Sequence, residues 1–174
     1  MPAERRAVIE PLNEGVDHVR GPNEAVVILE YGDYECPFSR LAYRAIEQIE
    51  ARQGVRFAFR HFPLTEIHPH ALAASGAAEA AALQSRFWEM HETLFHRQQA
   101  LEDDHLRGYA RELGLDLVRF DRDRAGEAVL GRIRRDVRSG VESGQVAGTP
   151  TLFINGVLYK GGYDAATISR VLAA

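Results

Sequence analysis

The stretch that decides the fold is residues 25–39, which read AVVILEYGDYECPFS. It starts with a continuous β-prone run, Ala25–Tyr31, that is typical of a central strand buried on both faces, and such strands pair in parallel. A short polar loop leads to Cys36 and Pro37. Proline suits the first position of a helix because the N–H that it lacks has no partner there. The stretch therefore predicts a strand, a loop and a helix that begins at the cysteine.

The residues that follow complete a β-α-β unit. Apolar side chains recur at the three- and four-residue spacing of an amphipathic helix, which Gly54 ends. They are Phe38, Leu41, Ala42, Ala45, Ile46 and Ile49. Val55, Phe57 and Phe59 then alternate with other residues, as in a second strand. This order predicts two parallel strands joined by a helix.

The rest of the chain predicts a helical block, a hairpin and a last helix. Residues 68–144 carry helical spacing and almost no strand signal. Asn155-Gly156 then lies between two apolar runs and predicts a tight β-hairpin, since type I′ turns need positive φ at both central residues. Asp164 is placed to cap a terminal helix that is buried through Ile168, Val171 and Leu172. The predicted fold class is α/β, in the order β-α-β, helical insertion, β-β-α.

Domain boundaries follow from the same pattern. Residues 1–22 show no clear period and are interpreted as a lead-in. Residues 23–67 and 145–174 form the predicted α/β domain, and residues 68–144 form an inserted helical domain.

The composition excludes several classes of function. The chain has 174 residues, a net charge of −4 and a pI near 6.0, which gives no basic surface for nucleic acid. No apolar run approaches the roughly 18 residues of a membrane span, and the N-terminal residues have no secretory signal. We therefore expect a cytoplasmic protein, or a periplasmic one if a signal peptide has been removed, with no nucleic-acid or membrane partner.

Cys36 is the one thiol of the chain, so neither an internal disulfide nor a cysteine-based zinc site can form. Its place at the start of a helix matters, because unpaired N–H groups and the helix dipole stabilise a thiolate there. We therefore expect a partly exposed and reactive cysteine. The alternative is that Cys36 is a small buried apolar residue, as lone cysteines usually are.

Two motifs connect the chain to a known family. ILEYGDYECPFS (residues 28–39) and GTPTLFING (residues 148–156), with the helical block between them, resemble the DsbA-like thiol:disulfide oxidoreductases. The resemblance covers about residues 16 to 172 and implies a thioredoxin-like fold with a helical insertion. The family's active site is usually Cys-x-x-Cys, whereas residues 36–39 here are Cys-Pro-Phe-Ser. Ser39 thus replaces the second, resolving cysteine.

The resemblance implies roles for three residues. The Cys36 thiolate would attack a substrate disulfide, and an external thiol such as glutathione must then release the mixed disulfide, since no internal thiol exists. Ser39, one helical turn away, can donate its hydroxyl to the thiolate, or it is an inert replacement of the missing cysteine. Glu30 resembles the buried acid that assists proton movement in this fold, or it lies at the solvated end of its strand.

Substrate-binding residues are implied at both motifs. Pro37 and Phe38 lie beside the cysteine in the sequence. In this family the proline that matches Pro150 is cis and lies against the cysteine, and the backbone of Thr149 would pair with an extended substrate. The alternative is a trans proline that simply begins a strand.

Neither a metal site nor a bound cofactor is expected. His68 and His70 are two residues apart before a helix, and His91 and His96 are five apart on different helical faces. The expected partners are protein or small-molecule disulfides and thiols, with glutathione or another external thiol as a co-substrate.

The leading hypothesis is a monothiol thiol-disulfide oxidoreductase that reduces, isomerises or deglutathionylates these disulfides. One alternative is a glutathione-dependent transferase or isomerase similar to the kappa class, in which an active-site serine stabilises the glutathione thiolate. The retained Cys36 argues against it. The other alternative is a catalytically silent peptide-binding or chaperone module that uses the groove beside Pro150.

Overall fold

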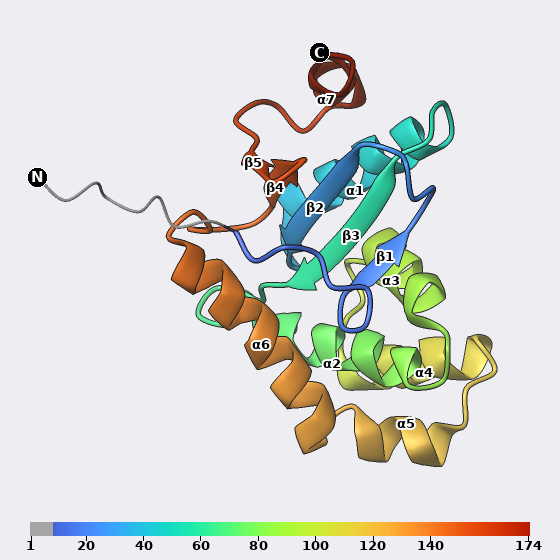
Figure 1. Cartoon of the computed structure of the whole chain (residues 1–174). Coiled ribbons are helices and arrows are strands. Elements are labelled where there is room, and N and C mark those ends of the chain that lie inside the picture. The colour runs from blue at the N-terminus through green and yellow to red at the C-terminus, as the bar shows by residue number, and fades with distance from the viewer. Residues whose placement is uncertain (1–8) are drawn as a thin grey trace, which may run out of the picture.

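The computed structural model describes residues 9–174, so residues 1–8 of the predicted lead-in lie outside the described residues. Figure 1 shows a central sheet with helices packed around it. The strands are β1 (His18–Arg20), β2 (Val27–Gly32), β3 (Arg56–His61), β4 (Thr151–Ile154) and β5 (Val157–Leu158). The helices are α1 (Pro37–Glu50), α2 (Ala71–Ala82), α3 (Phe87–His96), α4 (Asp103–Glu112), α5 (Leu117–Asp123), α6 (Glu127–Ser143) and α7 (Ala165–Leu172).

The five strands form one sheet in the order β1-β3-β2-β4-β5. β2 and β3 are parallel, as predicted, and the other pairings are antiparallel. β2 therefore lies at the centre, where Glu30 pairs with Phe59 of β3 on one side and with Leu152 of β4 on the other. The predicted α/β order of β-α-β, helical insertion and β-β-α is confirmed.

β1 lies in the segment that the sequence pattern interprets as a lead-in. It pairs antiparallel with β3, with Val19 opposite Ala58. The strand has only three residues, and so short a run shows no period. Pairing with β3, rather than a local pattern, is what makes these residues a strand.

The two faces of the sheet bury different side chains, because successive strand residues point to opposite faces. We call them the α1 face and the α6 face, after a helix that packs on each. The α1 face holds one hydrophobic cluster that joins the sheet to helices α1–α5 and α7, and its strand residues are Ile28, Phe57, Phe59 and Leu152. The α6 face holds a second cluster, in which Val137 of α6 packs against Leu29, Tyr31, Ala58 and Phe153.

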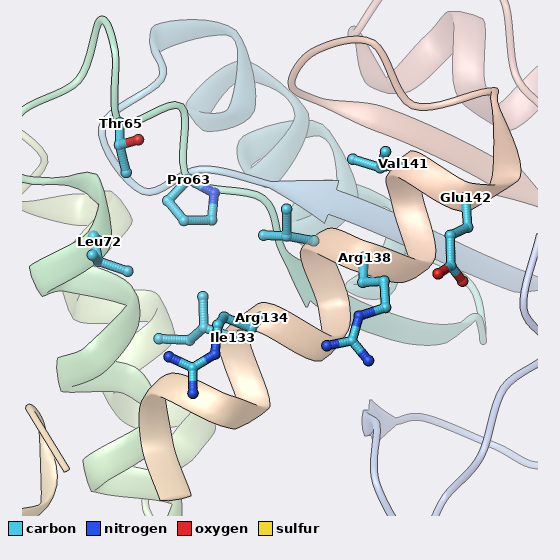
Figure 2. A pocket seen from close by; sticks show the side chains of 9 residues that line it. Pro63, Thr65, Leu72, Ile133, Arg134, Arg138, Val141 and Glu142 are labelled. Carbon is cyan, nitrogen blue, oxygen red and sulfur yellow. The ribbon is translucent and has the colours of Figure 1, made fainter. Parts of the chain in front are cut away.

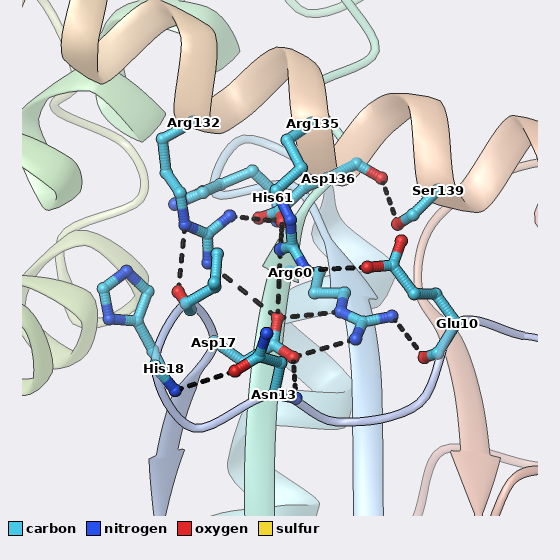
Figure 3. A network of polar contacts seen from close by, with 12 residues as sticks. Glu10, Asn13, Asp17, His18, Arg60, His61, Arg132, Arg135, Asp136 and Ser139 are labelled. Atoms are coloured by element: carbon cyan, nitrogen blue, oxygen red, sulfur yellow. Dashed lines mark hydrogen bonds and ion pairs between the residues drawn. The ribbon is translucent and has the colours of Figure 1, made fainter.

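The α6 face also holds a polar network centred on Arg60 of β3 (Figure 3). The Arg60 side chain is fully buried and forms a two-pronged ion pair with Asp17, with Nε to Oδ1 at 2.9 Å and Nη2 to Oδ2 at 2.8 Å. It also donates to the hydroxyl oxygen of Tyr31 at 2.8 Å and to the carbonyls of Glu10 and Pro11. Burial opposes ionisation of Asp17, but the hydrogen bonds from Arg60 and the Asn13 N–H, together with the charges of Arg60 and Arg135, outweigh it and hold the pKa below its usual value. The network ties the segment before β1 to the sheet.

The C-terminal elements follow the sequence prediction with one exception. Asn155 and Gly156 have φ of +47° and +79°, both positive as the predicted turn requires. The side chain of Asp164 caps α7, as predicted. Ile168 is fully buried, but Val171 is 44% exposed, so its prediction as a core residue is wrong. α7 is eight residues long and packs mainly on α1, which leaves the rest of its apolar stripe uncovered.

Helix α2 lies at the centre of the helical block, where it contacts α3, α4, α5 and α6. Small residues permit this packing: a Cβ added to Gly76 would lie 2.6 Å from the carbonyl oxygen of Arg124. From this group α6 leads back along the other face of the sheet (Figure 1). Among residues 9–174, no helix has the length and apolar character to cross a membrane.

Candidate functional site

Cys36 lies where the loop after β2 enters α1. It occupies the N-cap position with extended backbone, and Pro37 is the first helical residue. Its carbonyl accepts the hydrogen bond from Arg40 N at 3.1 Å. Its Sγ donates to the carbonyl oxygen of Thr149 at 3.4 Å, although 113 residues separate the two. The two sequence motifs therefore meet at the thiol.

The loop before β4 covers the cysteine. The Thr149–Pro150 peptide bond is cis, and the hydroxyl of Thr149 is buried with no hydrogen-bond partner among the described residues. Cys36 is only 4% exposed. The prediction of a partly exposed thiol is therefore wrong, because the Thr149 carbonyl lies against the sulfur.

Ser39 holds the loop that carries the thiol. It is fully buried in the first turn of α1, and its Oγ accepts a hydrogen bond from Asp33 N at 3.2 Å. Among the described residues, its hydroxyl makes no hydrogen bond to the Cys36 Sγ. Asp33 in turn accepts hydrogen bonds from the backbone N–H groups of Glu35 and Leu64. The serine thus belongs to a set of contacts that shape the loop.

Glu30 is a fully buried acid on the α1 face of β2. Neither of its carboxylate oxygens has a hydrogen-bond partner within residues 9–174. The alternative of a solvated strand end is therefore wrong, because Glu30 lies between strands β3 and β4. Burial without a partner disfavours the charged form and raises the pKa of Glu30 to about 8.

Gly32 makes room for this acid. A Cβ added to Gly32 would lie 2.8 Å from Glu30 Oε1 and 2.4 Å from the ring of Phe59. Both distances are too short for a side chain, so glycine is needed two residues after Glu30 on the same face.

Tyr163 is a site residue that the sequence did not reveal. It lies in the turn before α7, and its hydroxyl donates to the carbonyl oxygen of Pro150 at 3.2 Å. Burial raises its pKa, and Cys36 and Glu30 raise it further. The thiol and the buried acid therefore each lie within electrostatic reach of this phenol. The turn has no periodic pattern that would mark the tyrosine.

Gln98 brings the helical block to the site. Its side-chain Nε2 donates to the carbonyl oxygens of both Tyr34 and Cys36, at 2.8 and 2.9 Å. Gln98 itself is 8% exposed, so these two bonds form in the protein interior. It lies outside any motif, and nothing in the sequence identifies it. The insertion therefore helps to fix the position of the cysteine.

Two hollows beside the helix start share Pro37, Gln98 and Gln99 in their lining. One has a volume of about 290 Å³, and its other lining residues are Glu35, His70, Leu101 and Glu102. The other has a volume of about 270 Å³, and its other lining residues are Phe38, Arg40, Leu41 and Arg44. Of the predicted substrate-binding residues, two thus line these hollows, and the other two form the loop against the thiol.

The histidines near the cysteine pair with acids of its loop. His68 Nδ1 lies 2.8 Å from Asp33 Oδ2, and His70 Nδ1 lies 2.9 Å from Glu35 Oε1. These pairs fasten the start of the helical block to the loop before Cys36.

A larger cavity of about 550 Å³ lies between α6 and the segment after β3 (Figure 2). Apolar side chains line it, together with Arg134, Arg138 and Glu142 of α6. None of the predicted site residues lines this cavity, so it is separate from the cysteine site.

Similarity to curated proteins covers nearly the whole chain. A relative named Na(+)/H(+) antiporter NhaA 1, from Mycolicibacterium vanbaalenii, is 42% identical over 172 residues, which are 96% of this chain and 28% of that protein. The chain thus spans about a quarter of the length of the curated relatives that it matches.

Solved structures share the fold. A thioredoxin-like oxidoreductase from Silicibacter pomeroyi DSS-3 matches with a TM-score of 0.80 and 24% identity, covering 98% of this chain and 96% of that one. The thiol-disulfide exchange protein alpha-DsbA2 from Wolbachia pipientis matches with a TM-score of 0.79 and 19% identity, covering 92% and 87%. A family model described as Thioredoxin matches residues 13–174. The chain therefore belongs to the thioredoxin family, and its fold is the predicted DsbA-like one with a helical insertion.

Proposed function

We propose that the chain is a thiol-disulfide oxidoreductase that works through the single thiol of Cys36. The family and fold support thiol-disulfide chemistry in general. The observation that carries the proposal is the 3.4 Å contact between Cys36 Sγ and Thr149 O. It brings the cysteine at the start of α1 against the loop that contains Pro150. The chain holds one cysteine, so its cycle must use an external thiol.

The proposed cycle has two exchanges. The Cys36 thiolate attacks the glutathione sulfur of a glutathionylated thiol, the S–S bond breaks, and the substrate sulfur leaves as a thiolate that takes up a proton. Glutathione, as its thiolate, then attacks the Cys36–glutathione disulfide, releases the Cys36 thiolate and leaves as glutathione disulfide. The net reaction converts the glutathionylated thiol and one glutathione into the free substrate thiol and glutathione disulfide, so the substrate sulfur is reduced and only the incoming glutathione thiol is oxidised.

Glu30 supplies the proton in this proposal. With a pKa raised to about 8 by burial, its carboxyl group is mostly neutral at pH 7 and can protonate a leaving thiolate. Neither oxygen has another described partner to compete for that proton. Cys36 and Glu30 both raise the pKa of Tyr163, so the Tyr163 phenol would lie near the path of the proton from Glu30 to the departing thiolate.

A substrate can reach the Cys36 sulfur only when the Thr149 carbonyl moves away from it. An extended segment of a protein disulfide would pair with the Thr149 backbone and take the place of the Sγ contact. Ser39 supports this reading over a glutathione transferase, because its buried hydroxyl accepts from Asp33 N and does not reach an external thiol.

The compartment and the larger context are part of the proposal. A monothiol cycle suits a glutathione-rich reducing compartment such as the cytoplasm. In proteins as long as the relatives named Na(+)/H(+) antiporters, the part that matches this chain would be the redox domain.

Two assays test the function, with glutathione and a glutathionylated peptide in one and insulin reduction by dithiothreitol in the other. We expect the native chain to be active in the first and weak in the second, and Cys36→Ser to lose both activities. Ser39→Cys should raise insulin reduction at least about 10-fold, because it supplies a resolving thiol one helical turn from Cys36. Val118→Cys, a control that adds a thiol at a 79% exposed position of α5, should not raise it. Full activity of Cys36→Ser in the first assay would contradict the proposal.

A further inference from the structure

We infer that the α1 face carries a site for a divalent transition-metal ion, formed by His18, His61 and Glu79. These residues come from β1, β3 and α2, which are distant in the sequence. One ligand atom from each lies within 4.8 Å of the others. Within residues 9–174, this is the one group of three histidine, cysteine or acidic side chains that meets this spacing.

The three ligand atoms converge on one point. Glu79 Oε1 lies 2.6 Å from His18 Nε2 and 2.7 Å from His61 Nε2. The site therefore combines a carboxylate oxygen with two imidazole nitrogens that face it. In the metal-bound state, bonds to the ion would replace these two hydrogen bonds.

Aromatic packing holds both imidazole rings in place. The His18 ring stacks on Phe87 with ring centres 3.5 Å apart and planes at 8°. The His61 ring meets Phe87 at 79° and Phe59 at 85°, with ring centres 6.1 and 5.4 Å apart. Ligands that are already oriented lose little freedom on binding an ion, and an apolar shell of this kind is common around metal sites.

The donor set indicates the class of ion. Two imidazole nitrogens and one carboxylate oxygen suit Zn²⁺ and similar first-row ions, whereas Mg²⁺ and Ca²⁺ prefer oxygen ligands alone. His61 is fully buried, but the side chain of His18 is 17% exposed. Solvent therefore reaches the site from the β1 side, which gives an ion an entry path. An ion there would join β1 to the helical block.

The inference is independent of the redox proposal. Tyr34, in the loop before Cys36, has its ring 5.9 Å from that of His61, but neither it nor Cys36 contributes a ligand atom. The site contains no thiol, so it can be tested in a variant that lacks the cysteine.

The test is a Co²⁺ titration followed by visible absorption, with Zn²⁺ added in parallel thermal-unfolding scans. It uses Cys36→Ser protein, so that the thiol cannot bind cobalt. We expect one Co²⁺ per chain and a rise in the unfolding temperature with Zn²⁺. His18→Asn and Glu79→Gln should each weaken Co²⁺ binding at least about 10-fold. His105→Asn, which removes an exposed histidine paired with Glu102, serves as the matched control and should bind as before.

Two outcomes would overturn the inference: no Co²⁺ binding by the Cys36→Ser protein, or binding that His18→Asn leaves unchanged. If Glu79→Gln does not fold, Co²⁺ binding by His18→Asn tests the inference. His18 lies at the partly exposed edge of the site, so its replacement should disturb folding less.

Discussion

Two buried acids on opposite faces of the sheet, Glu30 and Asp17, differ in ionisation. On the α1 face, Glu30 has no hydrogen-bond partner among the described residues, and burial raises its pKa to about 8. On the α6 face, burial also opposes the charge of Asp17, yet the Arg60 guanidinium holds its pKa below the usual value. Burial alone therefore does not decide whether an acid is charged. For these two acids the difference lies in the partner: Arg60 keeps Asp17 charged, and Glu30, with no partner among the described residues, keeps its proton.

One step along the strand separates these environments. Glu30 and Tyr31 are successive residues of β2, and Phe59 and Arg60 face them as successive residues of β3. Because side chains alternate, the acid lies among apolar side chains while Arg60 meets the hydroxyl of Tyr31 on the other face. A slip of one residue would exchange the two faces, so the register is essential to both.

Removing the partner on the α6 face should have the largest effect. Arg60→Met leaves the fully buried Asp17 carboxylate with the Asn13 N–H at 2.9 Å and with the longer ion pairs to Arg135 at 3.4 Å and Arg132 at 4.0 Å. We expect the free energy of unfolding in urea to fall by about 3 to 5 kcal/mol. The double variant Arg60→Met/Asp17→Leu should recover much of this loss, since neither charge of the buried pair is left. An Arg60→Met protein as stable as the native chain would show that the pair does not hold this face.

Glu30 should give the native chain a pH dependence that Glu30→Gln lacks. The unfolded pKa is near 4.5 and the folded pKa about 8, so the folded chain keeps a proton that the unfolded chain releases. Stability from this group is complete below pH 4.5 and is lost as the pH rises towards 8. Between pH 5 and 7 the native chain should lose about 3 kcal/mol relative to Glu30→Gln. Parallel unfolding curves for the two proteins across this range would refute the raised pKa.

Gly32→Ala should break the α1 face by crowding. The new methyl group would lie 2.4 Å from the Phe59 ring and 2.8 Å from Glu30 Oε1, and neither neighbour is free to move in a packed core. We expect a loss of about 2 kcal/mol in unfolding free energy, the usual cost of overpacking. Gly108→Ala is the control, because a Cβ there meets no atom within 4 Å. Equal stability of the two variants would mean that the acid has more room than the structure shows.

Tyr31→Phe should give the smallest effect, on the α6 face. It removes a hydroxyl that accepts from Arg60 at 2.8 Å and lies 2.8 Å from Ser139 Oγ. Arg60 keeps its two bonds to Asp17, so the loss measured in urea should be about 1 kcal/mol. A loss as large as that of Arg60→Met would show that the phenol, and not the ion pair, organises the network.

Local patterns predicted most of the fold. The β2-α1-β3 unit and the Asn155-Gly156 hairpin were predictable because each depends on the order of apolar and turn residues within a short segment. β1 was not, because its three residues become a strand only by pairing with β3.

The candidate site was predictable only in part. Cys36, Glu30 and Pro150 belong to motifs, whereas the amide of Gln98 and the phenol of Tyr163 reach the site through contacts between distant segments. The burial of Cys36 was not predicted for the same reason, since the Thr149 carbonyl that lies against its sulfur is 113 residues away in the sequence.

That separation has a consequence for the new chain on the ribosome. β2, α1 and β3 are synthesised well before Thr149, and N-terminal elements begin to fold first. Until β4 is made and inserts beside β2, the sulfur of Cys36 has no carbonyl against it. Contacts between such distant residues also form slowly. The thiol is therefore most open to oxidation and to unwanted mixed disulfides during synthesis, before β4 has formed. It becomes protected only when the C-terminal strands pair with the sheet.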